Sequence, residues 1–191
     1  MTWLLQPLTS NTYWTYTENV FTEEELDRIV EQCSQLPVHN GGVETGEQVN
    51  TFRQSTISWV PTDNPDFHWI YTKLAAAVRN VNDSYFKFDI THIQTLQFTK
   101  YTADKGFYKP HLDVGMYATG RKLTFSLQLS DPYHHKGGEL VFHHLKTEPE
   151  MAPRARGKII FFPSFLVHEV LPVTEGVRYS LVGWVAGPQF K

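Results

Sequence analysis

The sequence Tyr108-Lys109-Pro110-His111-Leu112-Asp113 places a histidine and an aspartate two positions apart in a predicted β-strand. Side chains alternate between the two faces of a strand, so His111 and Asp113 point the same way from Cα atoms roughly 6.5 Å apart. The two side chains can therefore close on one metal ion. Alone, the triplet is weak evidence, because chance supplies such a motif easily and a pair of surface residues also explains it.

His168 is the candidate third ligand, and it comes from a strongly apolar stretch, residues 161–170. A histidine in such a stretch is usually a core residue whose hydrogen bonds are satisfied, and metal ligation is the sharper hypothesis. Two histidines and one carboxylate on one face of a metal leave three positions open, which is typical of non-haem Fe(II) oxygenases. The sequence thus predicts an iron site made of His111, Asp113 and His168.

Arg178 opens the last predicted strand, in which Arg178, Ser180 and Trp184 share a face. An arginine that points into a barrel needs an anion, because an unpaired buried charge is very costly. If the metal is iron, 2-oxoglutarate meets both needs. Its 1-carboxylate and 2-keto oxygen would take two iron positions, Arg178 would take the 5-carboxylate through a planar fork of donors, and one position would remain for O2.

The remaining pattern predicts a mainly β fold with flanking helices. Thr22 and Glu25 form a capping box ahead of a helix over residues 22–36, and apolar residues recur at helical spacing over 65–78. Residues 54–60 are a predicted strand. Short β-type runs separated by turn residues then favour a double-sheet jelly roll backed by the N-terminal helices. The strands are predicted near residues 85–90, 93–101, 107–114, 121–130, 138–144, 157–162, 166–171 and 177–186.

Length and charge limit the classes of protein. The 191 residues show no composition shift, so we expect one domain over 1–191, with helical support over about 1–84 and a β core over about 85–188. The net charge of −3, with scattered Lys and Arg, does not predict a nucleic-acid surface. Cys33 is the single cysteine and lies on an apolar helix face, which predicts core packing. Neither a signal peptide nor a membrane-spanning run is evident, so we expect a cytoplasmic protein.

These motifs together resemble the Fe(II)/2-oxoglutarate dioxygenases of the prolyl 4-hydroxylase superfamily, of the PKHD-type or prolyl hydroxylase-like kind. The resemblance covers about residues 94–186, with a weaker likeness at 52–55. It implies a double-stranded β-helix of the cupin-like jelly-roll type, with iron held by His111, Asp113 and His168. The implied reaction hydroxylates an unactivated C–H bond and converts 2-oxoglutarate and O2 to succinate and CO2, with ascorbate as a reductant for iron oxidised in uncoupled cycles. The matching segments are Tyr101 and residues 106–113, 121–130, 137–142, 157–162 and 168–184.

The resemblance also implies a set of cosubstrate contacts. Arg178 would bind the 5-carboxylate, helped by Ser180 and by Tyr101, which stands ten residues before His111 as does a cosubstrate-contacting tyrosine of the hypoxia-sensing prolyl hydroxylases. Gln128 stands where that subgroup has another tyrosine. Gln128 is therefore a candidate cofactor-binding residue that departs from the subgroup's pattern.

On the substrate side, the resemblance implies contacts from Tyr108, Trp184, Arg121 and Arg53, with the glycine-rich loop 40–52 as a lid. Core packing explains Trp184 as well, and a solvated surface charge explains either arginine as well. The implied substrate is a prolyl residue in a peptide or protein, which would become 4-hydroxyproline. A free amino acid, a small metabolite or a nucleobase stays open as the target, and so does a non-catalytic jelly-roll binding module with a structural metal. The oligomeric state is not predicted.

Two histidine pairs, His134-His135 and His143-His144, are not expected to form a second metal site. Adjacent residues of a strand face opposite ways, so each pair offers one imidazole at most to a common ion. His134 and His135 stand beside Gly137-Gly138 and are predicted to be exposed in a turn.

Overall fold

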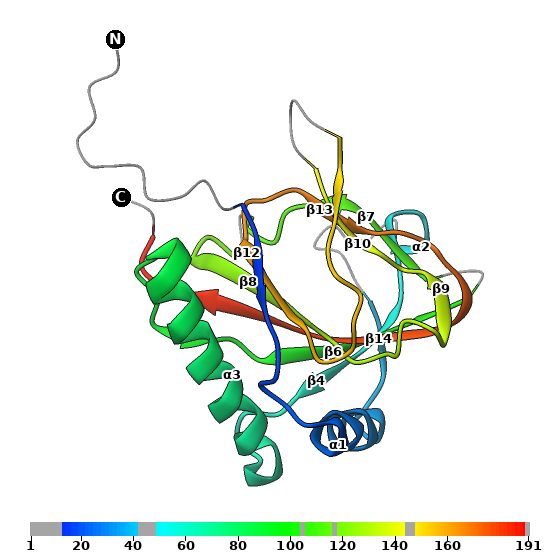
Figure 1. Cartoon of the computed structure of the whole chain (residues 1–191), viewed down its shortest axis with the longest axis horizontal. Helices are drawn as coiled ribbons and strands as arrows, with labels where there is room; N and C mark the ends of the chain where they lie inside the picture. Colours follow the sequence, from blue (N-terminus) through cyan, green and yellow to red (C-terminus); the bar gives the residue numbers. More distant parts are fainter. Residues whose placement is uncertain (1–12, 42–48, 104–105, 116–117, 144–147, 190–191) are drawn as a thin grey trace.

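Two β-sheets and two main helices make up the computed structural model, which describes residues 13–41, 49–103, 106–115, 118–143 and 148–189 (Figure 1). The helices are α1 (Glu23–Ser34), α2 (Val49–Phe52) and α3 (His68–Val81), with a 3-10 turn at Pro65–Phe67 and a π-type turn at Asn82–Phe86. The larger sheet contains β1 (Thr15–Thr17), β2 (His39–Asn40), β4 (Thr56–Val60), β5 (His92–Ile93), β6 (Leu96–Thr102), β8 (Arg121–Gln128), β9 (His135–Gly137), β12 (Ile159–Pro163) and β14 (Val173–Ala186). The smaller sheet contains β3 (Arg53–Gln54), β7 (Phe107–His111), β10 (Leu140–Phe142), β11 (Glu150–Met151) and β13 (His168–Val170).

The strand order brings segments far apart in sequence side by side. The larger sheet runs β1-β12-β8-β14-β6-β4-β2, with β5 and β9 paired to β14, and the smaller runs β11-β10-β13-β7-β3. The pairs between these strands are antiparallel, and β14 pairs with both β6 and β8. The predicted mainly β fold with flanking helices is confirmed.

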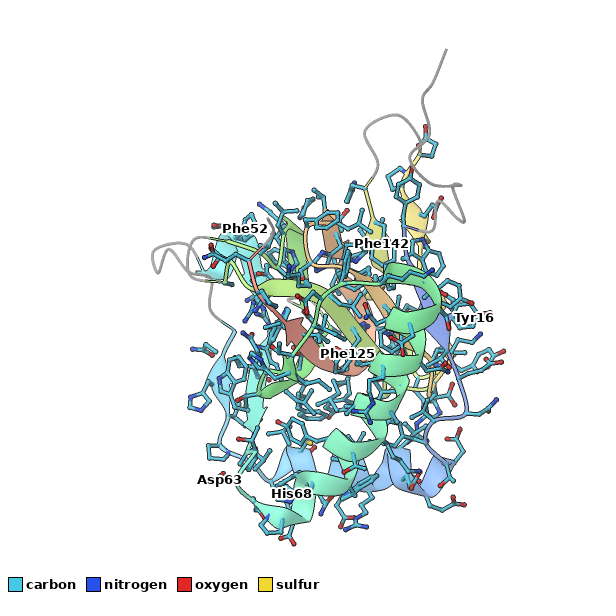
Figure 2. All side chains as sticks on the ribbon, turned by 90° about the vertical axis from the view of Figure 1, so that its left-hand side faces the viewer. Tyr16, Phe52, Asp63, His68, Phe125 and Phe142 are labelled. Carbon is cyan, nitrogen blue, oxygen red and sulfur yellow. The ribbon has the colours of Figure 1, made fainter. Side chains whose placement is uncertain are left out.

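Alternation along the strands gives the larger sheet two different faces. Phe125 and Leu181 belong to an apolar cluster that includes Leu26 of α1 and Leu74 of α3, so this face packs against the helices. Figure 2 shows Phe125 at the centre of the molecule. The opposite face carries polar residues such as Ser180, which line a cavity toward the smaller sheet. The fold therefore separates an apolar core on the helix side from a cavity between the sheets that is lined by both polar and apolar residues.

The first helix is formed as its sequence predicts. Thr22 Oγ1 accepts a hydrogen bond from Glu25 N at 3.3 Å, and Thr22 N donates to Glu25 Oε2 at 2.9 Å, which completes the capping box. Cys33 is fully buried, and burial raises the pKa of its thiol to about 12. The thiol thus packs in the core, as expected.

The predicted strand at residues 85–90 is wrong. The chain instead makes the π-type turn Asn82–Phe86, and Lys87 takes a left-handed conformation at φ 53°. The Asn82 side chain fixes this turn, because it donates to Phe88 O and accepts from Phe88 N, both at 3.0 Å. Phe86 and Phe88 stack on one another and pack against the helix-side core. Aromatic residues packed around a turn give the same composition signal as a strand.

The predicted exposure of His135 is also wrong, although His134 is exposed as expected. His135 lies in β9, is 6% exposed, and its Nδ1 lies 3.1 Å from Gly137 O. β9 pairs with β14, and Arg154 Nη2 lies 3.2 Å from His135 Nδ1 and donates to His135 O at 3.0 Å. Across the described ranges, the one cluster of potential metal ligands is His111, Asp113 and His168. His144 lies outside those ranges.

Within the described part of the chain, no helix combines the length and the apolar character that crossing a bilayer requires. The N-terminal segment contributes strands β1 to β4 as well as helices. The single-domain organisation stays a prediction.

Candidate active site

A cavity of about 720 Å³ lies between the two sheets. Its walls include the polar face of β6, β8 and β14 and side chains from β3, β7 and β13 of the smaller sheet. All three predicted metal ligands and Arg178 line it. The fold therefore brings the three candidate ligands and Arg178 into one cavity.

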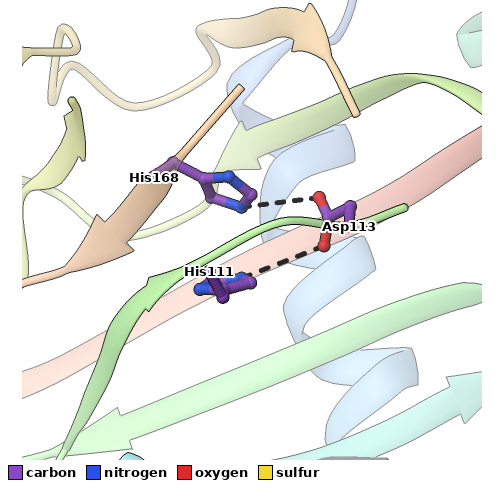
Figure 3. A group of neighbouring side chains, drawn as sticks. All are labelled: His111, Asp113 and His168. Carbon is purple, nitrogen blue, oxygen red and sulfur yellow. Dashed lines mark ion pairs between the residues drawn. The ribbon is translucent and has the colours of Figure 1, made fainter. Parts of the chain in front are cut away.

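The three candidate ligands converge at one point (Figure 3). Asp113 Oδ1 lies 3.9 Å from His111 Nε2, and Asp113 Oδ2 lies 3.4 Å from His168 Nε2. The three ligand atoms all lie within 4.8 Å of one another. His168 stands directly opposite His111 in the β13–β7 pair, so strand register brings the distant histidine to the site.

Hydrogen bonds from the second ring nitrogens set the tautomers of both histidines. His111 Nδ1 lies 2.8 Å from Lys109 O, and His168 Nδ1 lies 2.9 Å from Leu166 O. A carbonyl oxygen only accepts, so each Nδ1 carries a proton and each Nε2 is the ring nitrogen that faces Asp113. Outer hydrogen bonds of this kind are the usual support of metal-binding histidines. The donor set thus fits a divalent metal ion.

The charge states also suit a metal. Burial, reinforced by the neighbouring His168, lowers the pKa of His111 to about 3, so this imidazole stays neutral. Burial alone would raise the pKa of Asp113, but His168, His111 and the Thr124 hydroxyl outweigh it, and the net pKa is lowered. The site therefore presents an ionised carboxylate and a neutral imidazole, which are the forms that bind metals.

Thr124 supports the candidate ligand Asp113 through a hydrogen bond. Its Oγ1 donates to Asp113 Oδ2 at 2.8 Å and also lies 3.0 Å from Ser164 Oγ. We expect Thr124→Val to lower metal affinity roughly 10- to 100-fold, the usual effect of losing an outer partner. Competition with a metal chelator measures this. Thr124→Ser, which keeps the hydroxyl, should bind metal nearly as the unchanged protein does, and equal weakening in both variants would contradict the role of the hydrogen bond.

Arg178 is a buried cation with neutral partners. It is 3% exposed; its Nη2 donates to Gln128 Oε1 at 3.0 Å and its Nη1 to Ser180 Oγ at 3.4 Å. Its Cζ lies 5.5 Å from the centre of the Tyr101 ring, and burial lowers its pKa. No ion pair of Arg178 is formed within the described ranges. A cation in this position fits a ligand carboxylate, because buried charges are stable only when paired.

Ser180 and Tyr101 line the cavity with Arg178, whereas Gln128 does not line it and instead holds the guanidinium. Thr99 and Ser126 also line this end, and the sequence analysis did not single them out. Strand alternation could have found them, because Thr99 stands two positions from the candidate Tyr101 and Ser126 stands two positions from the candidate Gln128. Their hydroxyls add neutral polar groups around Arg178.

Gly138 shapes the pocket from behind Arg178. Its φ is +74°, and a Cβ there would lie 2.8 Å from Arg178 Cδ and 2.8 Å from Val173 Cγ2. We expect Gly138→Ala to displace the guanidinium and to weaken 2-oxoglutarate binding about tenfold with metal affinity retained, as calorimetry would show. Gly157→Ala is the matched control, because φ there is +81° but the added Cβ would meet Leu26 and not Arg178. Equal effects of the two variants would contradict the prediction.

The candidate substrate residues surround the same cavity. Trp184 is 7% exposed, and Arg121 Cζ lies 4.0 Å over its ring. Arg53 is 6% exposed and is therefore buried rather than solvated. Its Cζ lies 4.6 Å over the Tyr108 ring, which stacks on His111 with ring centres 3.4 Å apart. Of the predicted lid, residues 42–48 lie outside the described ranges, and α2 brings Phe52 to the cavity wall.

Comparisons with known proteins agree with this geometry. Residues 96–186 match the family model described as "2OG-Fe(II) oxygenase superfamily". A PKHD-type hydroxylase of Crocosphaera subtropica is 28% identical over 175 residues, which are 88% of this chain and 76% of the relative. A PKHD-type hydroxylase of Prochlorococcus marinus is 42% identical over 79 residues, but this match spans 41% of this chain and only 35% of that relative.

Two solved structures share the fold. A Pseudomonas putida prolyl-4-hydroxylase superposes with a TM-score of 0.77 at 22% identity, covering 92% of this chain and 94% of the other. A prolyl hydroxylase from Trichoplax adhaerens was solved in complex with a hypoxia inducible factor peptide fragment. It superposes with a TM-score of 0.78 at 17% identity, covering 92% of this chain and 84% of the other. These likenesses confirm the double-stranded β-helix fold. The family implies Fe(II), 2-oxoglutarate and O2 as cofactor and cosubstrates, and the metal triad and the buried arginine fit them. Over residues 96–186 the chain is thus similar to the 2OG-Fe(II) oxygenase superfamily, and PKHD-type hydroxylases are among its relatives.

Proposed function

We propose that the protein hydroxylates a prolyl residue in a peptide or protein, with 2-oxoglutarate and O2 converted to succinate and CO2. One observation carries the cofactor part of this proposal. A single cavity holds a triad of two histidines and one carboxylate together with a buried arginine whose partners are neutral.

Each part of the cavity has a task in this function. Bound Fe(II) and 2-oxoglutarate supply the oxidising chemistry for which protein side chains have no equivalent. His111, Asp113 and His168 would hold the metal, and their outer hydrogen bonds keep them in the ligating form. Arg178 and Ser180 would orient the distal carboxylate, while Gln128 holds the guanidinium in place. Apolar lining residues exclude water around them, namely Leu140, Phe162 and Val170.

The substrate side of the cavity supports a peptide over a small molecule. Trp59 and Leu112 line the cavity and are 41% and 47% exposed, so the cavity reaches the protein surface. A chain segment can therefore enter while its ends stay in solvent. The relatives named as hydroxylases and the neighbour solved with a peptide add support by analogy.

The test loads the protein with Fe(II) and isotope-labelled 2-oxoglutarate and offers it a library of proline-containing peptides. We expect succinate formation that rises with substrate, and a +16 Da product whose added mass maps to proline. Added ascorbate should prolong turnover. Hydroxylation of free amino acids, metabolites or nucleobases alone would favour the second candidate substrate class. Absence of both succinate and 2-oxoglutarate binding would favour a non-catalytic binding module.

A further inference from the structure

The cavity carries more positive charge than the proposed reaction uses. In the described ranges its charged lining consists of three arginines, Arg53, Arg121 and Arg178, and one carboxylate, Asp113. A divalent metal and a dicarboxylate cosubstrate cancel each other's charge. With Arg178 assigned to the cosubstrate, Arg53 is a further buried cation on the cavity wall, in a protein whose net charge is −3.

Arg53 is a buried arginine of this cavity lining. It is 6% exposed, its Nε donates to Ser55 Oγ at 2.9 Å, and its Nη2 donates to Gln97 Oε1 at 2.8 Å. A Cβ on Gly41 would lie 2.8 Å from Arg53 Nε, so Gly41 packs directly against the guanidinium. These partners are neutral, and the described ranges give Arg53 no ion pair. A buried guanidinium held rigidly by neutral groups is preorganised for a carboxylate.

The position of Arg53 places that carboxylate close to the reacting carbon. The guanidinium stacks on Tyr108, and Tyr108 stacks on His111, at centre separations of 4.6 and 3.4 Å. Together these separations span about two residues of extended chain at ~3.5 Å per residue. Arg178 lies on β14 of the other sheet and serves the cosubstrate, so the two arginines are available to two different anions.

We propose that Arg53 binds a carboxylate of the substrate, and that this carboxylate lies within about two residues of the hydroxylated carbon. The inference rests on the proposed function and narrows its substrate class to an acidic peptide segment. Opposite charges across a buried contact give specificity, and a neutral or basic segment would leave Arg53 buried without a counter-ion.

Two variants separate this role from a structural one. Arg53→Gln removes the charge, and it also removes the stack on Tyr108. Gln97→Glu leaves Arg53 and its stack in place and supplies an internal carboxylate at the position of Oε1, 2.8 Å from Nη2. Both variants should lose the preference for an acidic substrate. If Arg53 only supports Tyr108 and His111, Gln97→Glu should leave that preference intact. Lys136→Gln is the matched control, because its side chain is 71% exposed and pairs with Glu175 on the surface.

The measurement is calorimetry on the full chain loaded with Mn(II) and N-oxalylglycine, an analogue of 2-oxoglutarate that is not decarboxylated. The probes are acetyl-Gly-Asp-Pro-Asp-Gly-amide, the same peptide with Asn for both Asp, and acetyl-Gly-Gly-Pro with a free carboxylate. We expect the Asp peptide or the free-carboxylate peptide to bind about tenfold more tightly than the Asn peptide. In Arg53→Gln and Gln97→Glu, these affinities should become equal. Preference for the third probe over the Asp peptide would assign the anion to a chain terminus or a free amino acid.

Equal binding of the Asp and Asn peptides, together with no advantage of the free carboxylate, overturns the inference. So does binding of no probe, or an unchanged ratio in Gln97→Glu. In these cases tight binding of Mn(II) and N-oxalylglycine would leave the proposed function standing. Failure to bind the metal and the analogue would instead overturn the proposed function, and the inference with it.

Discussion

Asp113→Ala is expected to lower the Fe(II) affinity of the protein by more than ~100-fold, beyond the 10- to 100-fold that loss of an outer partner costs. Asp113 is the only carboxylate of the triad, and it lies 3.4 Å from His168 Nε2 and 3.9 Å from His111 Nε2. Its loss leaves two neutral imidazoles, which hold a hard divalent ion weakly. Metal content after dialysis and titration with Fe(II) under anaerobic conditions measure the change.

The control for this variant is Asp63→Ala. Asp63 is exposed and lies at the end of the molecule opposite Phe52, which lines the cavity (Figure 2). Its removal should leave metal affinity unchanged. Retention of one tightly bound iron per chain by Asp113→Ala would show that the metal lies elsewhere.

Arg178→Met is expected to weaken 2-oxoglutarate binding about 100- to 1000-fold while metal affinity stays within about twofold. The guanidinium is 3% exposed and is the charged group best placed for the distal carboxylate. Methionine keeps much of the side-chain length and removes the charge, so the carboxylate would enter the pocket without a partner. Calorimetric titration of 2-oxoglutarate into the metal-loaded protein measures the loss.

The same variant has an opposite effect on the protein without cosubstrate. Burial of Arg178 among neutral partners opposes its charge and lowers its pKa. Replacing a buried charge by an apolar side chain of similar size is often neutral or stabilising by about 1–4 kcal/mol. We therefore expect the thermal midpoint of cosubstrate-free Arg178→Met to stay level or rise, with the gain from added 2-oxoglutarate lost. Arg79→Met, an exposed change on α3, should alter neither quantity. A fall in both metal and cosubstrate affinity would indicate misfolding instead.

The local sequence rules found the centre of this site. Alternation places Arg178, Ser180 and Trp184 on one face of β14, and all three line the cavity. The apolar setting of His168 raised it above chance, and β13 does bring it opposite His111. These predictions succeeded because strand periodicity is local, and because a charged residue or a histidine in an apolar strand needs a specific partner.

The parts that escaped prediction depend on contacts between distant residues. His135 is buried beside Arg154, 19 positions away, and Gln97 accepts a hydrogen bond from Arg53, 44 positions away. The sequence around His135 or Gln97 gives no sign of these distant contacts. The turn at Asn82–Phe86 escaped because its side-chain hydrogen bonds to Phe88 oppose a strand that composition alone favours. Resemblance supplied the roles of Tyr101 and Gln128, and these roles stay proposals.

The central claim is that the metal triad and Arg178 act together on 2-oxoglutarate. The most direct test incubates the Fe(II)-loaded protein with 2-oxoglutarate labelled at C1, in the presence and absence of O2. The labelled CO2 and the unlabelled succinate are then both measured. The account predicts equal amounts of both products, dependent on O2, and their loss in Asp113→Ala and Arg178→Met. Turnover that persists in both variants, or an unchanged protein that neither binds nor decarboxylates 2-oxoglutarate, would contradict it.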